Sequence, residues 1–253
     1  MGKKMAVLVG CNYPTWNDLD KLDGCHTDVL LMRELLMDLM KMWKQIVPSD
    51  DNPITKMDFR HLVHRLPKNA TFTILADSCN SGGLIDKEPE QVGPGHPVGQ
   101  HGSSQAPPLT KKRKMIPIET LVQHLSALTG LESPDLGVHL LQHFGPDNCS
   151  ILYRVPPHQH PKPLNKDQGI LLSGCQSNES SYEGTNGFGE PCGQFDNAIQ
   201  EMFKGSQKSL TNRMIIIKAT KMLKDKRIMV QHPCLYCSKE NADKDFLGVR
   251  FHK

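Results

Sequence analysis

A candidate nucleophile stands where an apolar segment gives way to a polar, glycine-rich turn. Cys79 follows the apolar residues 74–76 and shortly precedes Gly82 and Gly83. The apolar residues are typical of the end of a buried strand, and the glycines allow a sharp turn with close backbone approach. Ligands of open α/β sheets bind at the carboxyl ends of the strands, so a thiol at this point is well placed to attack a substrate.

A small buried thiol is the alternative interpretation of Cys79, because free cysteines are common in protein cores. Polar neighbours argue against it: Asp77 and Ser78 precede the cysteine, and Ser81 follows it. A helix that begins soon after the turn would also stabilise a thiolate through its N-terminal dipole. The residues alone therefore favour a nucleophile.

Two acidic residues are candidates for selecting a cationic substrate. Asp77 ends the segment before Cys79, and Asp28 opens a candidate helix after the first apolar run, 5–10. Both lie where they would meet at one edge of a sheet, and two carboxylates there could bind a cationic side chain. Each has a simpler interpretation, as a helix cap or a turn residue, and the pattern alone leaves both open.

Strand-like and helix-like segments alternate, which predicts an α/β protein with a largely parallel sheet flanked by helices. Buried strands are expected at 5–10, 70–77 and 169–176, and a short late strand at 232–238. Helices are expected at 28–43, 56–66, 116–130, 133–145, 193–205 and 210–225. Expected caps are Thr27 or Asp28, Thr55 and Ser133, and expected glycine stops are Gly130 and Gly145.

Composition divides the chain into three parts. Residues 1–86 form a large-subunit region, here truncated, that carries the candidate nucleophile; 87–115 are rich in Pro, Gly and polar residues and predict a flexible linker; and 116–253 form a small-subunit region. The linker contains the basic run 111–114, for which an inert charged loop, a localisation signal and a protease site all stay open.

Charge and hydropathy exclude several functions. The net charge of the 253 residues is +3, too small to predict nucleic-acid binding. No apolar run is long enough to span a membrane, and the apolar part of the N-terminus is too short for a signal peptide. We therefore expect a cytoplasmic protein with reduced cysteines. Cys234 and Cys237 form one C-x-x-C pair without a second pair at zinc spacing, which favours two structural thiols over a metal site.

An ordered series of motifs resembles the type II plant metacaspases. The segment "DSCNSGGLIDKEPEQVGP" is similar to the nucleophile segment of that family, normally Asp-Ser-Cys-His-Ser-Gly-Gly. Further similar segments follow in the family's order: "MAVLVGCNYP", "LDGCHTDVLLM", "HLSALTG", "GILLSGCQ", "FDNAIQ" and "HPCLYCS". The likeness is strongest to the short-linker, metacaspase-9-like members.

The resemblance implies a caspase-like fold and a cysteine endopeptidase that cleaves proteins or peptides after Arg or Lys, with roles in programmed cell death. By matched position, Cys79 is the nucleophile, Asp28, Asp77 and Cys25 line the pocket for the basic side chain, and Lys114 is a candidate site of autoprocessing. Intact metacaspases are possible partners.

The family's calcium site is not expected here. Lys56 and Met57 stand where the family carries an acidic pair, and Asp86 alone cannot form a cage of oxygens. We therefore expect neither a cofactor nor a metal.

One family element is missing from the sequence. The general base of the family is a histidine in a Tyr-Ser-Gly-His-Gly turn, and the sequence contains no such motif. The chain passes directly from the first helix into "KQIVPSD" near 42–45, which implies an internal deletion of interior strands. The strand at 5–10 is then expected beside the Cys79 strand. His26, His61 and His64 are candidate substitutes for the base.

The missing motif leaves three interpretations: a cysteine endopeptidase, a catalytically dead pseudo-metacaspase that binds or regulates other proteins, and an incomplete gene model. The first keeps the chemistry of the family, and the other two follow from the loss of its base.

Overall fold

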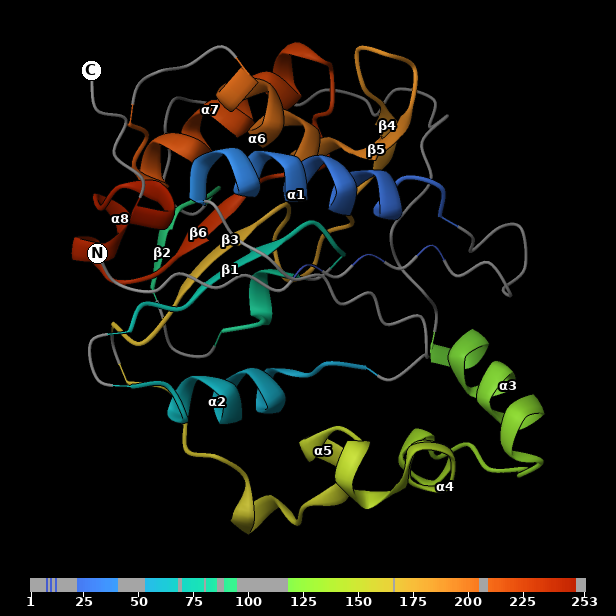
Figure 1. The fold of residues 1–253 in the computed structure, drawn as a ribbon. Coiled ribbons are helices and arrows are strands. Elements are labelled where there is room, and N and C mark those ends of the chain that lie inside the picture. Colours follow the sequence, from blue (N-terminus) through green and yellow to red (C-terminus); the bar gives the residue numbers. More distant parts are fainter. Residues whose placement is uncertain are drawn as a thin grey trace.

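The computed structural model describes residues 8, 10, 12, 22–40, 53–67, 70–79, 81–85, 89–94, 118–165, 167–204 and 209–248. Its described part is an α/β structure in which a four-stranded sheet lies between two groups of helices (Figure 1). No described helix has the length and apolar character needed to cross a membrane.

The sheet has the strand order β1-β3-β6-β2. The strands are β1 (Thr73–Ala76), β2 (Glu90–Val92), β3 (Ile170–Ser173) and β6 (Cys234–Tyr236). β1 pairs with β3 in parallel, whereas β6 is antiparallel to both β3 and β2. The described sheet is therefore mixed, with β6 alone running opposite to the other three strands. The parallel pair matters for function because it brings the ends of β1 and β3, Ala76 and Ser173, side by side.

Apolar residues of β3 contribute to the cores on both faces of the sheet. Leu171 and Leu172 are both fully buried, but successive side chains of a strand point to opposite faces. Leu172 packs with Phe195 and Ile215 in the main core, whereas Leu171 packs with Val63 in a second core. A run of apolar residues is what a strand covered on both faces requires.

Helices cover both faces. On one face lie α1 (Cys25–Met40), α6 (Gln194–Lys204) and α7 (Asn212–Asp225), with α8 (Lys239–Ala242) near the edge (Figure 1). On the other lies α2 (Lys56–His64), which contacts α5 (Ile151–Arg154). The helices α3 (Ile118–Thr129) and α4 (Leu136–Asn148) pack on each other around a third, smaller core.

Short elements complete the described structure. A hairpin of β4 (Glu183–Thr185) and β5 (Pro191–Gly193) leads into α6. The 3-10 turns are η1 (Ser81–Gly83), η2 (Pro157–Gln159) and η3 (Phe246–Gly248).

Several expected boundaries are confirmed. Thr55 caps α2, and its backbone N–H donates to Asp58 Oδ2 at 2.7 Å. Gly130 follows α3 with a φ of 69°, in the left-handed region that ends many helices. Gly145 has a φ of 75° and interrupts the helical backbone near the end of α4.

Other expectations are wrong. α1 begins at Cys25, so Asp28 lies inside its first turn instead of capping it. The cap of α4 is Asp135, whose side chain accepts from Gly137 N at 2.8 Å, and not Ser133. β2 lies within the range expected to be linker, because three residues suffice to pair with β6.

The strand that leads to Cys79 is less buried than expected: Ile74 is the one buried residue of β1, since β1 is an edge strand of the described sheet. Apart from Leu8 and Gly10, the expected strand 5–10 lies outside the described residues, and so does the junction 42–45. The expected adjacency of the two strands therefore stays a prediction.

Candidate active site

The nucleophile turn is held against the end of β3. Ser81 is buried, and its hydroxyl lies 2.6 Å from the hydroxyl of Ser173, the last residue of β3. A Cβ added at Gly82 would lie 2.6 Å from Ser177 N and 2.9 Å from Gln176 C. The glycine is therefore required because the backbone after β3 passes directly over it.

Cys79 is half-buried and contacts the backbone of Ser181. The Ser181 N–H donates to Cys79 Sγ at 3.2 Å, and the thiol can donate to Ser181 O at 3.6 Å. The thiol therefore lies at the shared end of β1 and β3, as the sequence predicted. A peptide group faces its sulfur.

Asp77 lies between β1 and the start of α6. Its Oδ1 accepts a hydrogen bond from the hydroxyl of Ser181, and its Oδ2 accepts one from Asp196 N at 3.1 Å. Asp196 is in the first turn of α6, where backbone N–H groups lack partners within the helix and favour a negative charge. The carboxylate is thus fixed by one hydroxyl and one helix N–H.

Asp28 reaches the same segment from α1. It is buried, and Gly193 N donates to its two carboxylate oxygens at 2.9 and 2.8 Å. Gly193 precedes Asp196 by three residues, so the structure brings Asp28 and Asp77 to one short segment at the N-terminus of α6. Both acids predicted from the sequence to share a site thus contact that segment, and their role in binding a cation stays a prediction.

Cys25 opens the helix that carries Asp28. The start of this helix is anchored by Glu183, whose carboxylate accepts from Gly24 N at 2.7 Å and from Asp23 N at 3.1 Å. A Cβ added at Gly24 would lie 2.7 Å from the Cys192 backbone, which shows how closely α1 and β5 approach. Cys25 is thereby placed at the same end of the molecule as Asp28.

The candidate replacement bases are elsewhere engaged or exposed. His64 Nε2 lies 2.9 Å from Lys162 O, beside the loop that follows α5. His61 is exposed on α2, and His26 is exposed at the start of α1. No described contact joins any of the three to Cys79.

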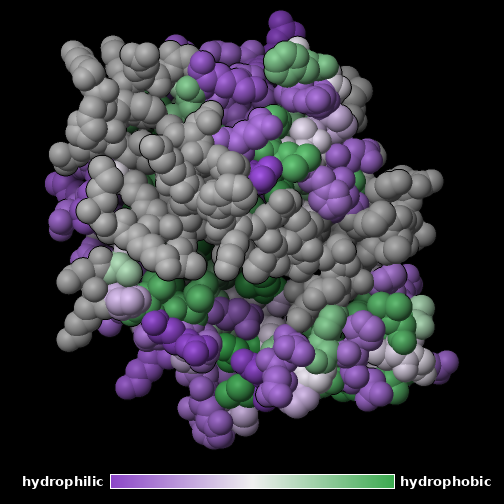
Figure 2. Space-filling view, viewed as in Figure 1, coloured by the Kyte–Doolittle hydropathy of each residue, from purple (hydrophilic) through white to green (hydrophobic). Residues whose placement is uncertain are grey.

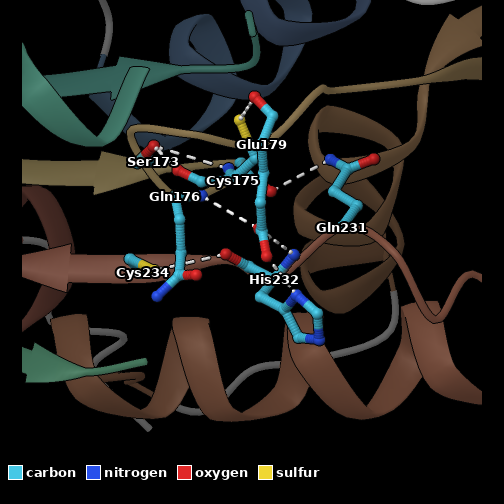
Figure 3. A network of polar contacts seen from close by, with 8 residues as sticks. Ser173, Cys175, Gln176, Glu179, Gln231, His232 and Cys234 are labelled. Carbon is cyan, nitrogen blue, oxygen red and sulfur yellow. Dashed lines mark hydrogen bonds and ion pairs between the residues drawn. The ribbon is translucent and has the colours of Figure 1, made fainter. Parts of the chain in front are cut away.

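A partly buried polar network lies behind the nucleophile turn (Figure 3). The Glu179 carboxylate accepts from Gln176 N at 3.1 Å, from His232 N at 3.1 Å and from His232 Nδ1 at 2.6 Å. The hydrogen bond to Glu179 raises the pKa of His232 above its ordinary value, although partial burial opposes the rise. Cys175 Sγ donates to Ser78 O at 3.3 Å and ties this network to the residue before Cys79.

Gln231 is the central buried side chain of the same region. Its Oε1 accepts from Tyr182 N at 3.1 Å, and its Nε2 donates to Gly174 O and to Ser181 Oγ, both at 3.0 Å. Sequence reasoning identified neither Gln231 nor Ser181. The available signal was weak: a polar residue next to a short apolar segment.

The described residues offer no evident metal site. Among them, no group of three or more His, Cys, Asp or Glu side chains is arranged to hold a metal ion. Burial raises the pKa of Cys234 to about 12, so this thiol stays protonated, and Cys237 is also buried. The C-x-x-C pair therefore has the character of core thiols. Lys114, the candidate autoprocessing residue, and Asp86 lie outside the described residues, so the role of Lys114 stays a prediction.

A shallow hollow of about 340 Å³ lies between α2 and α5. The candidate base His61 lines it, whereas Cys79, Asp77 and Asp28 do not. Figure 2 shows hydrophobic side chains interspersed with hydrophilic ones over this part of the surface. The acid in the hollow, Asp58, already accepts from Ser150 Oγ at 2.7 Å and Ile151 N at 3.0 Å. Asp58 therefore links the N-termini of α2 and α5, which is a structural role.

Known proteins resemble the chain over nearly its whole length. Residues 37–244 match the caspase-domain family. Metacaspase-9 of Arabidopsis thaliana is 34% identical, with 97% of each chain covered. Metacaspase-6 of the same plant is 28% identical, over 80% of this chain and 71% of the relative. The expected resemblance and the caspase-like α/β fold are confirmed. The chain belongs to the caspase-domain family of cysteine-type endopeptidases and is a metacaspase-like protein.

Proposed function

We propose that the chain binds peptides through an Arg or Lys side chain and attacks the following peptide bond with Cys79. One observation carries the proposal: Asp28 and Asp77 converge on 193–196, and Asp77 shares Ser181 with Cys79. Carboxylates are suited to a guanidinium or ammonium group, whose N–H groups donate to their oxygens. When an Arg or Lys side chain is bound there, the backbone carbonyl of that substrate residue would lie near the Cys79 thiol.

The reaction needs a proton as well as a nucleophile. Attack of the Cys79 thiolate on the carbonyl carbon forms a carbon–sulfur bond, and the carbon–nitrogen bond then breaks as the amine takes up a proton. Water later hydrolyses the thioester. In the family's arrangement a histidine supplies that proton, and its motif is missing from this sequence. We therefore propose binding and acylation with slow turnover.

The alignment supports an internal deletion as the origin of the missing motif. It spans 323 residues, whereas 97% of this 253-residue chain is about 245 residues, so about 78 aligned positions have no residue here. Interior strands of the family's sheet are the proposed loss. Sequencing the transcript across 42–45 tests whether the deletion is real or belongs to an incomplete gene model.

The direct test is cleavage of fluorogenic peptides that end in Arg, Lys or norleucine, from pH 5 to 8, by the wild-type chain and C79A. We expect slow release after Arg and Lys, none after norleucine, and none with C79A. Equal rates with all three peptides would refute the selectivity. Fast cleavage abolished by C79A would refute slow turnover and reveal a substitute base.

A non-catalytic role is the second candidate, favoured by the absence of the Tyr-Ser-Gly-His-Gly motif. In that role the chain would bind intact metacaspases or their cytoplasmic substrates without cleaving them. It predicts that C79A binds a purified active metacaspase as tightly as the wild type does and that neither cleaves peptides.

A further inference from the structure

The nucleophile and the substrate-selecting acid are joined by one residue, Ser181. Its backbone N–H donates to Cys79 Sγ at 3.2 Å, while its hydroxyl donates to Asp77 Oδ1. Ser181 is fully buried, whereas Cys79 and Asp77 are half-buried. Ser181 thus contacts both the candidate nucleophile and the candidate substrate-binding acid.

The direction of the hydroxyl is set by Gln231. This side chain is 2% exposed, and its Nε2 donates to Ser181 Oγ at 3.0 Å. Because an amide nitrogen can only donate, the Ser181 oxygen must accept there, and its own hydrogen is left for Asp77. A hydroxyl that could otherwise rotate is thereby directed at the carboxylate.

Gln231 also fixes the backbone on both sides of Ser181. Its Oε1 accepts from Tyr182 N at 3.1 Å, and its second amide hydrogen is donated to Gly174 O at 3.0 Å. Gly174 begins the loop after β3, and Tyr182 ends it. Both amide hydrogens and the oxygen of Gln231 therefore take part in holding this loop.

The neighbouring residue holds the middle of the loop. His232 donates its backbone N–H and its Nδ1–H to Glu179, which in turn accepts from Gln176 N. The adjacent residues 231 and 232 thus fasten the loop 174–182 at its start, middle and end. Hydrogen bonds at three points of one loop restrict its motion, and rigid support is what a selective site requires.

We propose that Ser181, oriented by Gln231, is a positioning residue for selection of Arg and Lys. Its hydroxyl holds the Asp77 carboxylate in the direction that receives the substrate cation. Its backbone N–H independently holds the sulfur of Cys79. The inference rests on the proposed function, since it assigns the residue that sets the selectivity of that site.

The two contacts of Ser181 are separable by mutation. S181A removes the hydroxyl but keeps the backbone N–H, and S181T keeps both. We therefore expect S181A to weaken selection for the cation without changing the thiol. Hydrogen bonds to charged groups are strong enough that this loss should reduce selectivity about tenfold or more.

The experiment compares two reversible probes that bind through the thiol, a peptidyl-arginine aldehyde and the matching norleucine aldehyde. The ratio of their dissociation constants reports selectivity without requiring turnover. Alkylation of Cys79 by iodoacetamide across pH, followed by mass spectrometry of its peptide, reports the thiol. S180A, which changes the neighbouring half-buried hydroxyl, is the matched control.

We expect a lower Arg/norleucine ratio in S181A, recovery in S181T, a wild-type ratio in S180A, and one alkylation profile for all four chains. Equal loss of affinity for both aldehydes would show a merely structural role and overturn the inference. If the wild-type chain prefers Arg and S181A keeps the same ratio, the inference is also overturned. That result would leave the proposed function intact. A wild-type chain without preference for Arg would overturn both.

If S181A does not fold, as judged by thermal melting, Q231M replaces it in the same assay. This variant keeps the Ser181 hydroxyl but removes the donor that directs it. We expect a ratio between that of the wild type and one, and an unchanged ratio would overturn the inference.

Discussion

Replacing Asp77 by Asn is the most informative single change, because its effects on stability and on selectivity follow from the same contacts. The carboxylate accepts one hydrogen bond from the Ser181 hydroxyl and one from Asp196 N, at 3.1 Å. An Asn offers one oxygen and one NH2 group, so one of the two donors must face another donor. The variant also loses a negative charge at the N-terminus of α6.

The expected cost follows from these two losses. A hydrogen bond to a charged group contributes about 1.5–3 kcal/mol, and an acid at a helix N-terminus contributes about 0.3–1 kcal/mol. The D77N chain should therefore be less stable by about 2–4 kcal/mol. For a chain of this size that corresponds to a melting temperature lower by roughly 4–16 °C. The loss of one of two acids should also reduce the affinity for the peptidyl-arginine aldehyde about tenfold or more, with little change for norleucine.

Thermal melting and aldehyde binding are measured on the same preparations, with D147N as the control. Asp147 is exposed on α4, so its replacement removes the same charge without these contacts. A D77N chain that melts with the wild type would refute the energetic reasoning. An unchanged Arg/norleucine ratio in a folded D77N chain would refute the role of Asp77 in selection.

Three further changes test other parts of the structure. The hydrogen bond to Glu179 raises the pKa of His232. The stabilisation by this pair is therefore complete below about pH 6.5 and is lost as the pH rises through the raised pKa of the folded state. The difference in melting temperature between H232Q and the wild type should shrink from pH 6 to 9. Burial alone would raise the pKa of Asp58, but the hydrogen bonds from Ile151 N and its other partners outweigh burial and lower that pKa. The stabilisation by Asp58 is therefore present above about pH 4 and is lost as the pH falls through the lowered pKa. D58N should melt at a lower temperature than the wild type at pH 7 and approach the wild-type melting temperature at pH 2–3. G82A places a Cβ against backbone atoms and should cost about 1–3 kcal/mol by thermal melting, whereas G187A, at an open position, is its control.

The sequence predicted the elements whose apolar pattern leaves little choice. β3 was expected because its residues are apolar in succession, and α6 and α7 because their apolar residues recur with the helical period. The β4–β5 hairpin was missed, since its three-residue strands contain glycine and proline and owe their pairing to their surroundings. Helix starts were also uncertain: α1 begins before Asp28, whose side chain accepts from the distant Gly193 N and does not cap the helix.

The site was predicted unevenly for a related reason. Cys79, Asp77 and Asp28 could be identified because a thiol and acids beside apolar segments are conspicuous and because they match a family motif. Ser181 and Gln231 are polar residues of ordinary kinds, and their roles depend on contacts between residues 49 to 104 positions apart in sequence. Polar residues such as these contribute to the site because they are buried with hydrogen-bond partners, and their burial depends on the complete fold.

The convergence of the two acids on α6 has a physical cause that a motif does not express. A pocket for a cation needs two carboxylates close together before substrate arrives, and their mutual repulsion opposes this. At the start of α6 each acid receives backbone N–H donors, from Gly193 and from Asp196, and the helix dipole adds favourable potential. Under the proposed function, the N-terminus of the helix thus offsets part of the repulsion that the substrate cation would otherwise have to offset. A change that moves the start of α6 should therefore disturb both acids together, even where it touches neither side chain.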